Sequence, residues 1–285
     1  MFNALRELVE KAGSGTISEI AKREQAELKN TEISAQVERM HEILEVMRAA
    51  GEDGKTPGRH SVSGLTGGGA LKLFAHAQQA ASGPVVGMAI ARALSAAESN
   101  ACMGKIVAAP TAGACGILPA ALLTLQEQRG YSDGQVVDAL FTAAAVGAVI
   151  AARASISGAE GGCQAECGSA AAMAAAAVCE LCGARPQAAA DAAAFALMNS
   201  MGLVCDPVRG LVEVPCVYRN VSGVAIALTA ADLALSGIRC PLEPDDVVDA
   251  MKAVGEQLPA SLRETGEGGC AACRVTCPAW EAQKE

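Results

Sequence analysis

The chain has 285 residues, and its 22 basic and 31 acidic side chains give a formal net charge of −9. An acidic chain in which Lys and Arg form no cluster lacks the charge that binds phosphate backbones, so we expect no nucleic-acid partner. Hydrophobic residues make up 51% of the sequence, but aromatic residues only 2%. The core must therefore consist of small aliphatic side chains, which favours closely packed helices over β-sandwiches.

The first 50 residues have the pattern of amphipathic helix. Thr16 and Glu19 have the spacing of a capping box at the start of a helix. Apolar residues recur at steps of four and three from Ile33 to Met47 and mark one buried face. We expect Gly51 to end this helix.

A polar, Gly-rich loop is expected at residues 51–63, and Ala-rich segments then alternate with short Gly/Pro breaks. The predicted helices are 70–82, 84–101, 119–129, 133–154, 168–183, 186–201, 220–236 and 244–257. No run of β-branched residues recurs at the spacing of a parallel sheet, and only Leu211 to Val217 is a candidate short strand or extended loop. The sequence therefore predicts an all-α fold, mostly helical with Gly/Pro-rich loops.

The N-terminal residues are charged and include no long apolar segment, so we expect no secretory signal and a cytoplasmic protein. The longest uncharged run, residues 106–126, contains Pro110 and Pro119, so we expect no membrane span there. We expect the N-terminal segment, residues 1–50, to pack with residues 51–285 as one compact unit.

Backbone can approach a ligand closely where Gly removes the side chain, so the Gly-rich breaks between helices are candidate site loops. Four of them are singled out by composition: residues 63–69, 109–116, 157–163 and 205–216.

The 12 cysteines are many for a chain expected in a reducing compartment, which argues against a set of structural disulfides. Cys179 and Cys182 have the spacing of metal ligands, but in an Ala-rich helix both would lie on one buried face, and we favour core packing. Cys270, Cys273 and Cys277 form a second closely spaced group, for which a metal site and a mobile tail stay open.

A third group has no compact metal-binding spacing, since Cys205 lies 42 positions after Cys163 and Cys216 lies 11 positions after Cys205. Each of the three lies beside Gly or Pro in a predicted turn. Backbone N–H groups that such turns free can donate to the sulfides of an iron-sulfur cluster. From the residues alone, a cluster here is one hypothesis and simple burial is another.

Four strings resemble the catalytic α chain or α domain of the iron-sulfur-dependent L-serine dehydratases. They are SGLTGGGA, APTAGACGILPA, SGAEGGCQAECG and GLVCDPVRGLVEVPC, the last followed by Arg219-Asn220. The likeness covers nearly all of residues 60–270. It implies a mostly helical catalytic domain and a 4Fe-4S cluster held by Cys163, Cys205 and Cys216. It also implies a separate β chain, as in the two-chain members, and a higher oligomer is compatible with it.

The same resemblance implies elimination of water from L-serine, with pyruvate and ammonia as products. With three cysteine ligands one iron is open to the substrate hydroxyl and acts as a Lewis acid. Lys72, Ser63 and His60 are the candidate bases for the α-proton, and the sequence does not choose among them.

Substrate-binding candidates come from the Gly-rich strings. Consecutive N–H groups of Thr66, Gly67 and Gly68 at a helix start could bind the substrate carboxylate, or this segment is a plain tight turn. Thr111 and Gly113 could hold another part of the amino acid. Glu160 and Asn220 lie next to the cluster motifs and are further candidates for the site.

Other functions remain open at this stage. L-threonine dehydration and L-cysteine desulfuration would follow the same elimination. A pyridoxal-phosphate enzyme is disfavoured because the sequence lacks an α/β pattern and a recognisable Schiff-base lysine. A non-catalytic zinc or iron-sulfur protein that uses the cysteine-rich tail belongs to a different class.

Overall fold

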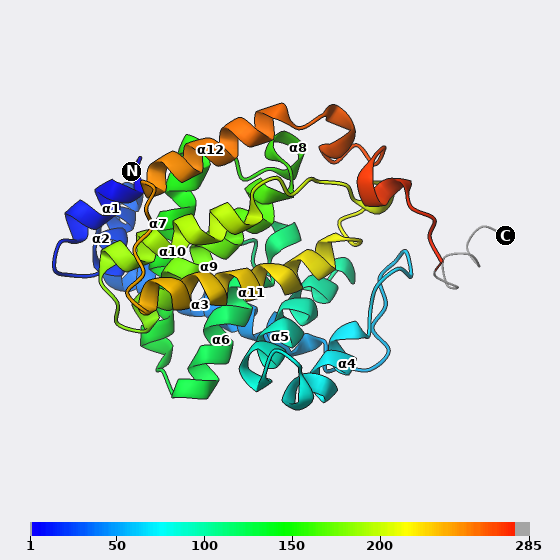
Figure 1. The fold of residues 1–285 in the computed structure, drawn as a ribbon. Coiled ribbons are helices and arrows are strands. Elements are labelled where there is room, and N and C mark those ends of the chain that lie inside the picture. The colour runs from blue at the N-terminus through cyan, green and yellow to red at the C-terminus, as the bar shows by residue number, and fades with distance from the viewer. Residues whose placement is uncertain (1, 277–285) are drawn as a thin grey trace.

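The computed structural model describes residues 2–276, and over this range the chain folds into twelve α-helices joined by loops and short turns (Figure 1). In chain order they are α1 (Leu5–Ala12), α2 (Ile17–Lys29), α3 (Ile33–Asp53), α4 (Gly69–His76), α5 (Pro84–Ala101), α6 (Ile117–Arg129), α7 (Asp133–Arg153), α8 (Gly158–Gly161), α9 (Ser169–Leu181), α10 (Pro186–Ser200), α11 (Cys216–Leu235) and α12 (Pro244–Gln257). No strand forms between residues 2 and 276, where one isolated bridge joins Cys205 to Arg263. The prediction of an all-α protein is confirmed.

The core is built around α9, whose side chains are almost all buried and whose alanines let neighbouring helices approach closely. Helices α7, α10 and α11 pack against it, and α9, α10 and α11 lie side by side at the centre of Figure 1. One hydrophobic cluster includes Leu8 of α1, Leu44 of α3 and Met251 of α12. The N-terminal helices therefore contribute to the same core as the later ones.

The N-terminal 50 residues form three helices, and the predicted capping box is present at the start of α2. The Thr16 hydroxyl accepts from the Glu19 N–H, and the Glu19 carboxylate accepts from the Thr16 N–H. The prediction that Gly51 ends the third helix is wrong, because α3 continues to Asp53. Gly51 is buried, and a Cβ there would lie 3.5 Å from Leu123 of α6, so this glycine serves helix packing.

Most later helices begin and end within two residues of the predicted bounds. Helix α4 is shorter than predicted because its end tightens into a 3₁₀ turn, Ala77–Gln79. Of the two alternatives for Leu211 to Val217, the short strand does not form, and residues 211–215 are a loop. The Val208 N–H donates to the Val214 carbonyl at 2.8 Å, which folds this segment back on itself, and α11 already begins at Cys216.

Among the described residues one helix, α7, is long and apolar enough to cross a membrane, and 67% of its most apolar window is buried inside the protein. Its neighbours there include α2 and α9. The uncharged run at residues 106–126 does not form one continuous helix. It contains a loop, a 3₁₀ turn at Ala112–Ala114 and the first turns of α6.

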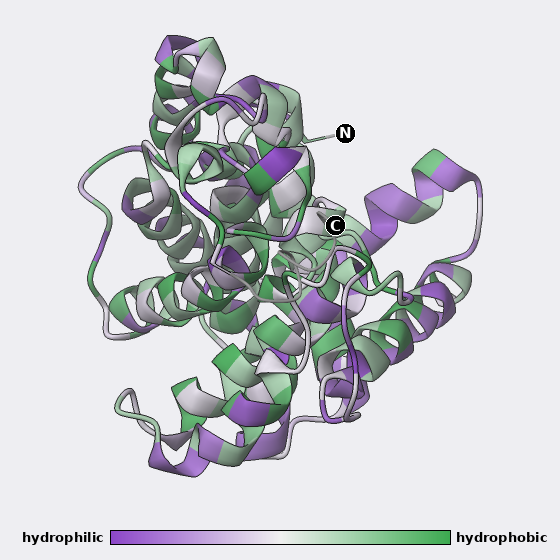
Figure 2. Cartoon of the chain, turned by 90° about the vertical axis from the view of Figure 1, so that its right-hand side faces the viewer, coloured by the Kyte–Doolittle hydropathy of each residue, from purple (hydrophilic) through white to green (hydrophobic). Residues whose placement is uncertain are grey.

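The Gly-rich segments gather at one end of the helical bundle. In Figure 1 the loop before α4, the short helix α8, the loop before α11 and the segment after α12 all lie toward the right-hand side. Figure 2 looks onto that end and shows loops of mixed hydropathy near its centre, with helices around them. We call this region the loop end, and the candidate site lies here.

Candidate functional site

Three segments of the loop end carry Cys163, Cys205 and Cys216, and all three side chains are buried. Cys163 follows a glycine of positive φ and precedes a π-helical turn, Gln164–Gly168. Cys205 is held by backbone bonds, since its N–H donates to the Leu262 carbonyl at 2.9 Å and its carbonyl accepts from Glu264 at 2.7 Å. Cys216 is the first residue of α11.

The pKa shifts of these thiols show that they influence one another. Burial raises the pKa of Cys216 to about 12, and the negative charge of the nearby Cys163 is the next cause. The pKa of Cys205 is also raised, by burial first and then by Cys163. Three thiolates in such a place need a positive charge beside them, and a metal centre supplies one.

The space around the cysteines also depends on missing side chains. A Cβ on Gly158 would lie 2.9 Å from the Cys205 sulfur, and a Cβ on Gly162 would lie 2.8 Å from the Leu203 carbonyl oxygen. On the other side, the Arg219 guanidinium donates to Asp206 at 2.6 Å and to the Val204 carbonyl at 2.8 Å. These contacts hold the segment around Cys205 against α11.

The donor set suits a cluster better than a single metal ion. Between residues 2 and 276, no three His, Cys, Asp or Glu side chains converge as they would around one ion. A 4Fe-4S cluster places a different requirement on its ligands, because each cysteine binds a different iron. Three buried cysteines from separate segments, with glycines beside them, fit that requirement.

A fourth buried cysteine lies in the same region and was not singled out by the sequence analysis. The Cys167 sulfur is 3.3 Å from the Cys163 sulfur, within the distance of a hydrogen bond between thiol groups. This bond lowers the pKa of Cys163 and, together with burial, raises the pKa of Cys167. The spacing of four residues within one helical turn is the signal that could have identified it.

Thr111 and Gly113 are brought together with Glu166, another residue that sequence reasoning missed. The Thr111 hydroxyl donates to the Glu166 carboxylate. A Cβ on Gly113 would lie 2.6 Å from a Glu166 oxygen, so glycine is needed for this approach. Burial raises the pKa of Glu166 above its ordinary value. The site therefore includes a half-buried carboxyl group with a hydroxyl beside it.

Asn220 is fully buried, and its amide bonds to backbone groups. Its Nδ2 donates to the carbonyls of Gly113 at 2.6 Å and Cys216 at 3.0 Å, and its Oδ1 accepts from the Gly116 N–H at 2.8 Å. These bonds tie the loop at 109–116 to the start of α11. Asn220 thus positions the site, and its predicted contact with substrate stays a prediction.

Ser63 and Thr66 both donate to Glu213, which lies in the loop three residues before Cys216. The Ser63 hydroxyl donates to a Glu213 carboxylate oxygen at 2.7 Å, and the Thr66 hydroxyl donates to the same oxygen at 3.2 Å. All three side chains are buried. The Glu213 carboxylate therefore joins the first Gly-rich string to the segment that carries two of the cysteines.

Gly67 and Gly68 have positive φ, and a Cβ on Gly67 would lie 2.3 Å from the Arg59 carbonyl oxygen. The next two N–H groups, at the start of α4, donate to the Glu98 carboxylate at 2.9 and 3.0 Å. A carboxylate of this chain therefore caps α4. Binding of the substrate carboxylate by Thr66, Gly67 and Gly68 stays a prediction.

The other candidates lie at the surface. Lys72 on α4 and His60 in the preceding loop are exposed. Glu160 on α8 is exposed too, and accepts from the Ser155 hydroxyl at 2.6 Å. The structure therefore does not bring these three side chains together with the buried cysteines.

Of the closely spaced cysteines, Cys179 is buried in α9 as predicted. Cys182 does not share its buried position, because it lies half-buried at the end of that helix beside Arg129. In the tail, the Cys270 N–H donates to the Asp206 carboxylate at 2.6 Å, and Cys273 is exposed. Cys277 lies outside the described residues.

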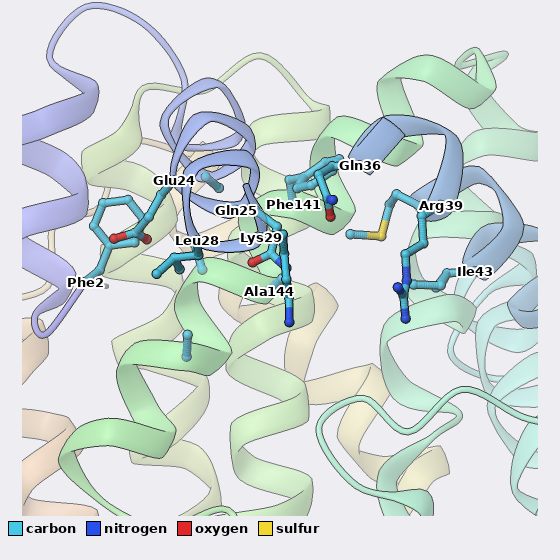
Figure 3. A pocket seen from close by; sticks show the side chains of 14 residues that line it. Phe2, Glu24, Gln25, Leu28, Lys29, Gln36, Arg39, Ile43, Phe141 and Ala144 are labelled. Atoms are coloured by element: carbon cyan, nitrogen blue, oxygen red, sulfur yellow. The ribbon is translucent and has the colours of Figure 1, made fainter. Parts of the chain in front are cut away.

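A separate cavity of about 330 Å³ lies between α2, α3 and α7 (Figure 3). Its walls include Met40, Ile43 and Phe141, and the side chains of Lys29 and Arg39 extend beside it. None of the candidate site residues lines this cavity.

The fold and the site together define a class: an all-helical protein whose loop end gathers buried cysteines and carboxyl groups from several segments. The sequence pattern of the serine dehydratase alpha chain family matches residues 12–271, and the chain belongs to this family. The expected family resemblance is thereby confirmed.

Individual relatives show how much of the chain is shared. It is 46% identical over 276 residues to the probable L-serine dehydratase, alpha chain, of Bacillus subtilis, covering 95% of this chain and 92% of that one. It is 39% identical over 279 residues to the L-serine dehydratase, alpha chain, of Peptoniphilus asaccharolyticus, covering 96% of each. It is 43% identical over 190 residues to L-serine dehydratase 2 of Escherichia coli, covering 65% of this chain but 41% of that longer one.

Proposed function

We propose that this chain is the catalytic alpha chain of an L-serine dehydratase, which removes water from L-serine to give pyruvate and ammonia. The two similar alpha chains match it over more than nine-tenths of their length. The observation that carries the proposal is the burial of Cys163, Cys205 and Cys216 at the loop end. We further propose that a separate beta chain completes the enzyme, as the name of these alpha chains suggests.

In this proposal Cys163, Cys205 and Cys216 hold a 4Fe-4S cluster. When bound, the cluster supplies a Lewis acid for the hydroxyl oxygen that leaves the substrate. The protein keeps the three thiolates out of water and places the Arg219 guanidinium near Cys163, where its positive charge offsets theirs. Gly158 and Gly162 let the segment that carries Cys205 approach the segment that carries Cys163.

We propose Ser63 as the group that accepts the α-proton. A serine hydroxyl is a poor base by itself, but here it donates to the buried Glu213 carboxylate at 2.7 Å, which draws the proton away from its oxygen. Lys72 and His60 are exposed, so either could act only where substrate or the beta chain covers it.

We propose that Thr111 and Glu166 bind the α-ammonium group of the substrate. Their hydroxyl and carboxyl oxygens are the acceptors that an ammonium needs, and Glu166 is half-buried. A charged donor with a buried acceptor gives a stronger hydrogen bond than neutral partners do. Asn220 has an indirect role in this proposal, because its hydrogen bond to Gly113 holds the loop that carries Thr111.

The test is an anaerobic assay of the purified chain with L-serine, L-threonine and L-cysteine, each with and without the beta chain. We expect pyruvate and ammonia from serine, at a rate that rises when the beta chain is added. Preferential release of 2-oxobutyrate from threonine, or of sulfide from cysteine, would redirect the assignment to the related eliminations. No elimination from any of the three would contradict the proposed function.

The compartment is part of the same proposal. All eleven cysteines between residues 2 and 276 are free thiols. Free thiols in this number, six of them buried, suit a reducing compartment, so we propose that the chain acts in the cytoplasm.

A further inference from the structure

Cys167 has no role in a cluster held by three other cysteines, yet its sulfur lies 3.3 Å from the sulfur of Cys163. Both side chains are buried, with exposed fractions of 1% for Cys163 and 3% for Cys167. The two residues are four apart along the chain and share one helical turn. If one sulfur is oxidised, the other therefore lies in direct contact with it.

The backbone already suits a covalent bond between them. In an α-helix, residues four apart have Cα atoms roughly 6 Å apart, and the π-helical turn Gln164–Gly168 that holds Cys167 directly follows Cys163. This separation lies within the range of about 4.4–6.8 Å found across disulfides. Because the two sulfurs are already 3.3 Å apart, we expect the covalent bond to form mainly through side-chain rotation. Cys205 and Cys216 lie on other segments and lack this shared turn.

We propose that Cys163 and Cys167 form a reversible disulfide when peroxide reaches the chain without its cluster. The inference rests on the proposed role of Cys163 as a cluster ligand. Hydrogen peroxide is smaller than a substrate amino acid, so a site that admits serine also admits peroxide.

The chemistry balances in two steps, an oxidation followed by a condensation. Peroxide first oxidises the Cys163 thiol to a sulfenic acid and releases one water. The Cys167 sulfur then attacks the Cys163 sulfur, the sulfur–sulfur bond forms, and the sulfenic oxygen leaves as a second water. The two thiols lose two electrons in total, and peroxide gains them. A dithiol reductant reverses the reaction and restores both thiols.

The consequence is protection of a cluster ligand. A sulfenic acid without a neighbouring thiol is oxidised further to a sulfinic acid, which is irreversible for most proteins. The disulfide stops this progression and keeps Cys163 recoverable. It also makes loading of iron conditional on a thiol reductant, because an oxidised Cys163 cannot bind iron.

The first experiment maps the bond in the full chain after removal of iron with a chelator and treatment with hydrogen peroxide. Cleavage after glutamate cuts at Glu160, Glu166 and Glu180, so fragments 161–166 and 167–180 separate unless a disulfide joins them. We expect mass spectrometry without reductant to find these two fragments linked. The Cys179→Ser variant is the matched control, since it removes the other cysteine of the second fragment and should leave the link intact.

The second experiment measures iron uptake after the same peroxide treatment followed by dithiothreitol. We expect the unaltered chain and Cys179→Ser to recover most of their capacity for iron. The Cys167→Ser variant should recover several-fold less, with sulfinic acid at Cys163 in its peptide map.

Two results in the unaltered chain would overturn the proposal. In the first, fragment 161–166 is recovered unlinked and its cysteine is overoxidised. In the second, fragment 161–166 is linked to a fragment that carries Cys205 or Cys216. The peptide map of the unaltered chain decides the matter even where Cys167→Ser loads iron poorly. If the untreated chain does not bind iron, the proposed cluster is contradicted but the disulfide is not, because the peptide map detects the disulfide in the chain without iron.

Discussion

At the scale of single residues, the candidate site depends on buried polar groups whose partners lie on other segments. Glu213 accepts from Ser63 and Thr66, and Asn220 bonds to the backbone of Gly113 and Gly116. Removing one partner of a buried pair leaves the other without water to replace it, which costs more than an exposed hydrogen bond would. Single substitutions here should therefore have effects that differ sharply from those at nearby exposed positions.

Asn220 gives the clearest stability prediction. Asn220→Ala removes three hydrogen bonds from buried backbone groups, so we expect the free energy of unfolding to fall by about 1–3 kcal/mol. Urea unfolding measures this. Thr229→Ala, on the exposed face of the same helix, should change stability by less than about 0.5 kcal/mol. If the two variants lose equal free energy of unfolding, the hydrogen bonds of Asn220 do not hold the loop, and its positioning role is contradicted.

Ser63 gives the clearest catalytic prediction. If it accepts the α-proton, Ser63→Ala should lower kcat for serine by about 100-fold or more, with the iron content unchanged. Steady-state kinetics and iron analysis of one anaerobic preparation measure both. The exposed Lys105 offers a control, and Lys105→Gln should keep the parent kcat. A large loss in Lys72→Gln with little change in Ser63→Ala would assign the base to Lys72 instead.

At the scale of elements, Gly and Pro positions predicted most helix boundaries because they act locally on the backbone. The errors occurred where distant contacts decide. Helix α3 continues past Gly51 because that glycine packs against α6, and α11 begins early because the loop before it folds back on itself.

The same limit applies to the site. The four sequence strings identified the loops of the site. Glu213, Glu166 and Cys167 could be recognised as site residues only from the side chains that they contact in the folded chain. Spacing alone does not reveal that a carboxylate will accept from a serine 150 residues away. Lys72 and His60 were attractive by residue type, and the fold leaves both exposed.

Gly113 tests one of these contacts between elements. Gly113→Ala would place a methyl group 2.6 Å from a Glu166 oxygen, which must separate Glu166 from Thr111 or shift the loop. We expect a loss of about 1–3 kcal/mol in unfolding free energy, measured by urea, and a higher KM for serine. Gly134→Ala is the control, because a Cβ there meets only Ser132 at 3.8 Å in α7. It should stabilise the chain by up to about 1 kcal/mol, and equal behaviour of the two variants would contradict the contact.

At the scale of the whole molecule, the loop end joins segments from four distant parts of the chain around the cysteines. A group that binds all three would link these segments and stabilise the folded state, because the unfolded chain offers no such site. The account therefore predicts that folding and iron binding are coupled.

Removal of iron by an anaerobic chelator should lower Tm by roughly 5–10 °C, which corresponds to a loss of about 3 kcal/mol for a chain of this size. Differential scanning calorimetry measures this shift. The Cys205→Ser variant should show almost no response to the chelator, because it lacks one ligand. If the chelator leaves the Tm of the unaltered chain unchanged, iron binding does not stabilise the folded state, which would contradict the account.

The measurement that tests the central claim most directly is the content of iron and acid-labile sulfide in anaerobically purified protein. It should compare the unaltered chain, Cys163→Ser, Cys205→Ser, Cys216→Ser and the buried control Cys179→Ser. The account predicts about four of each per chain in the unaltered protein and the control, and loss of the intact centre in the other three variants. Zinc without sulfide in the unaltered chain, or full iron and sulfide in any of those three variants, would contradict it.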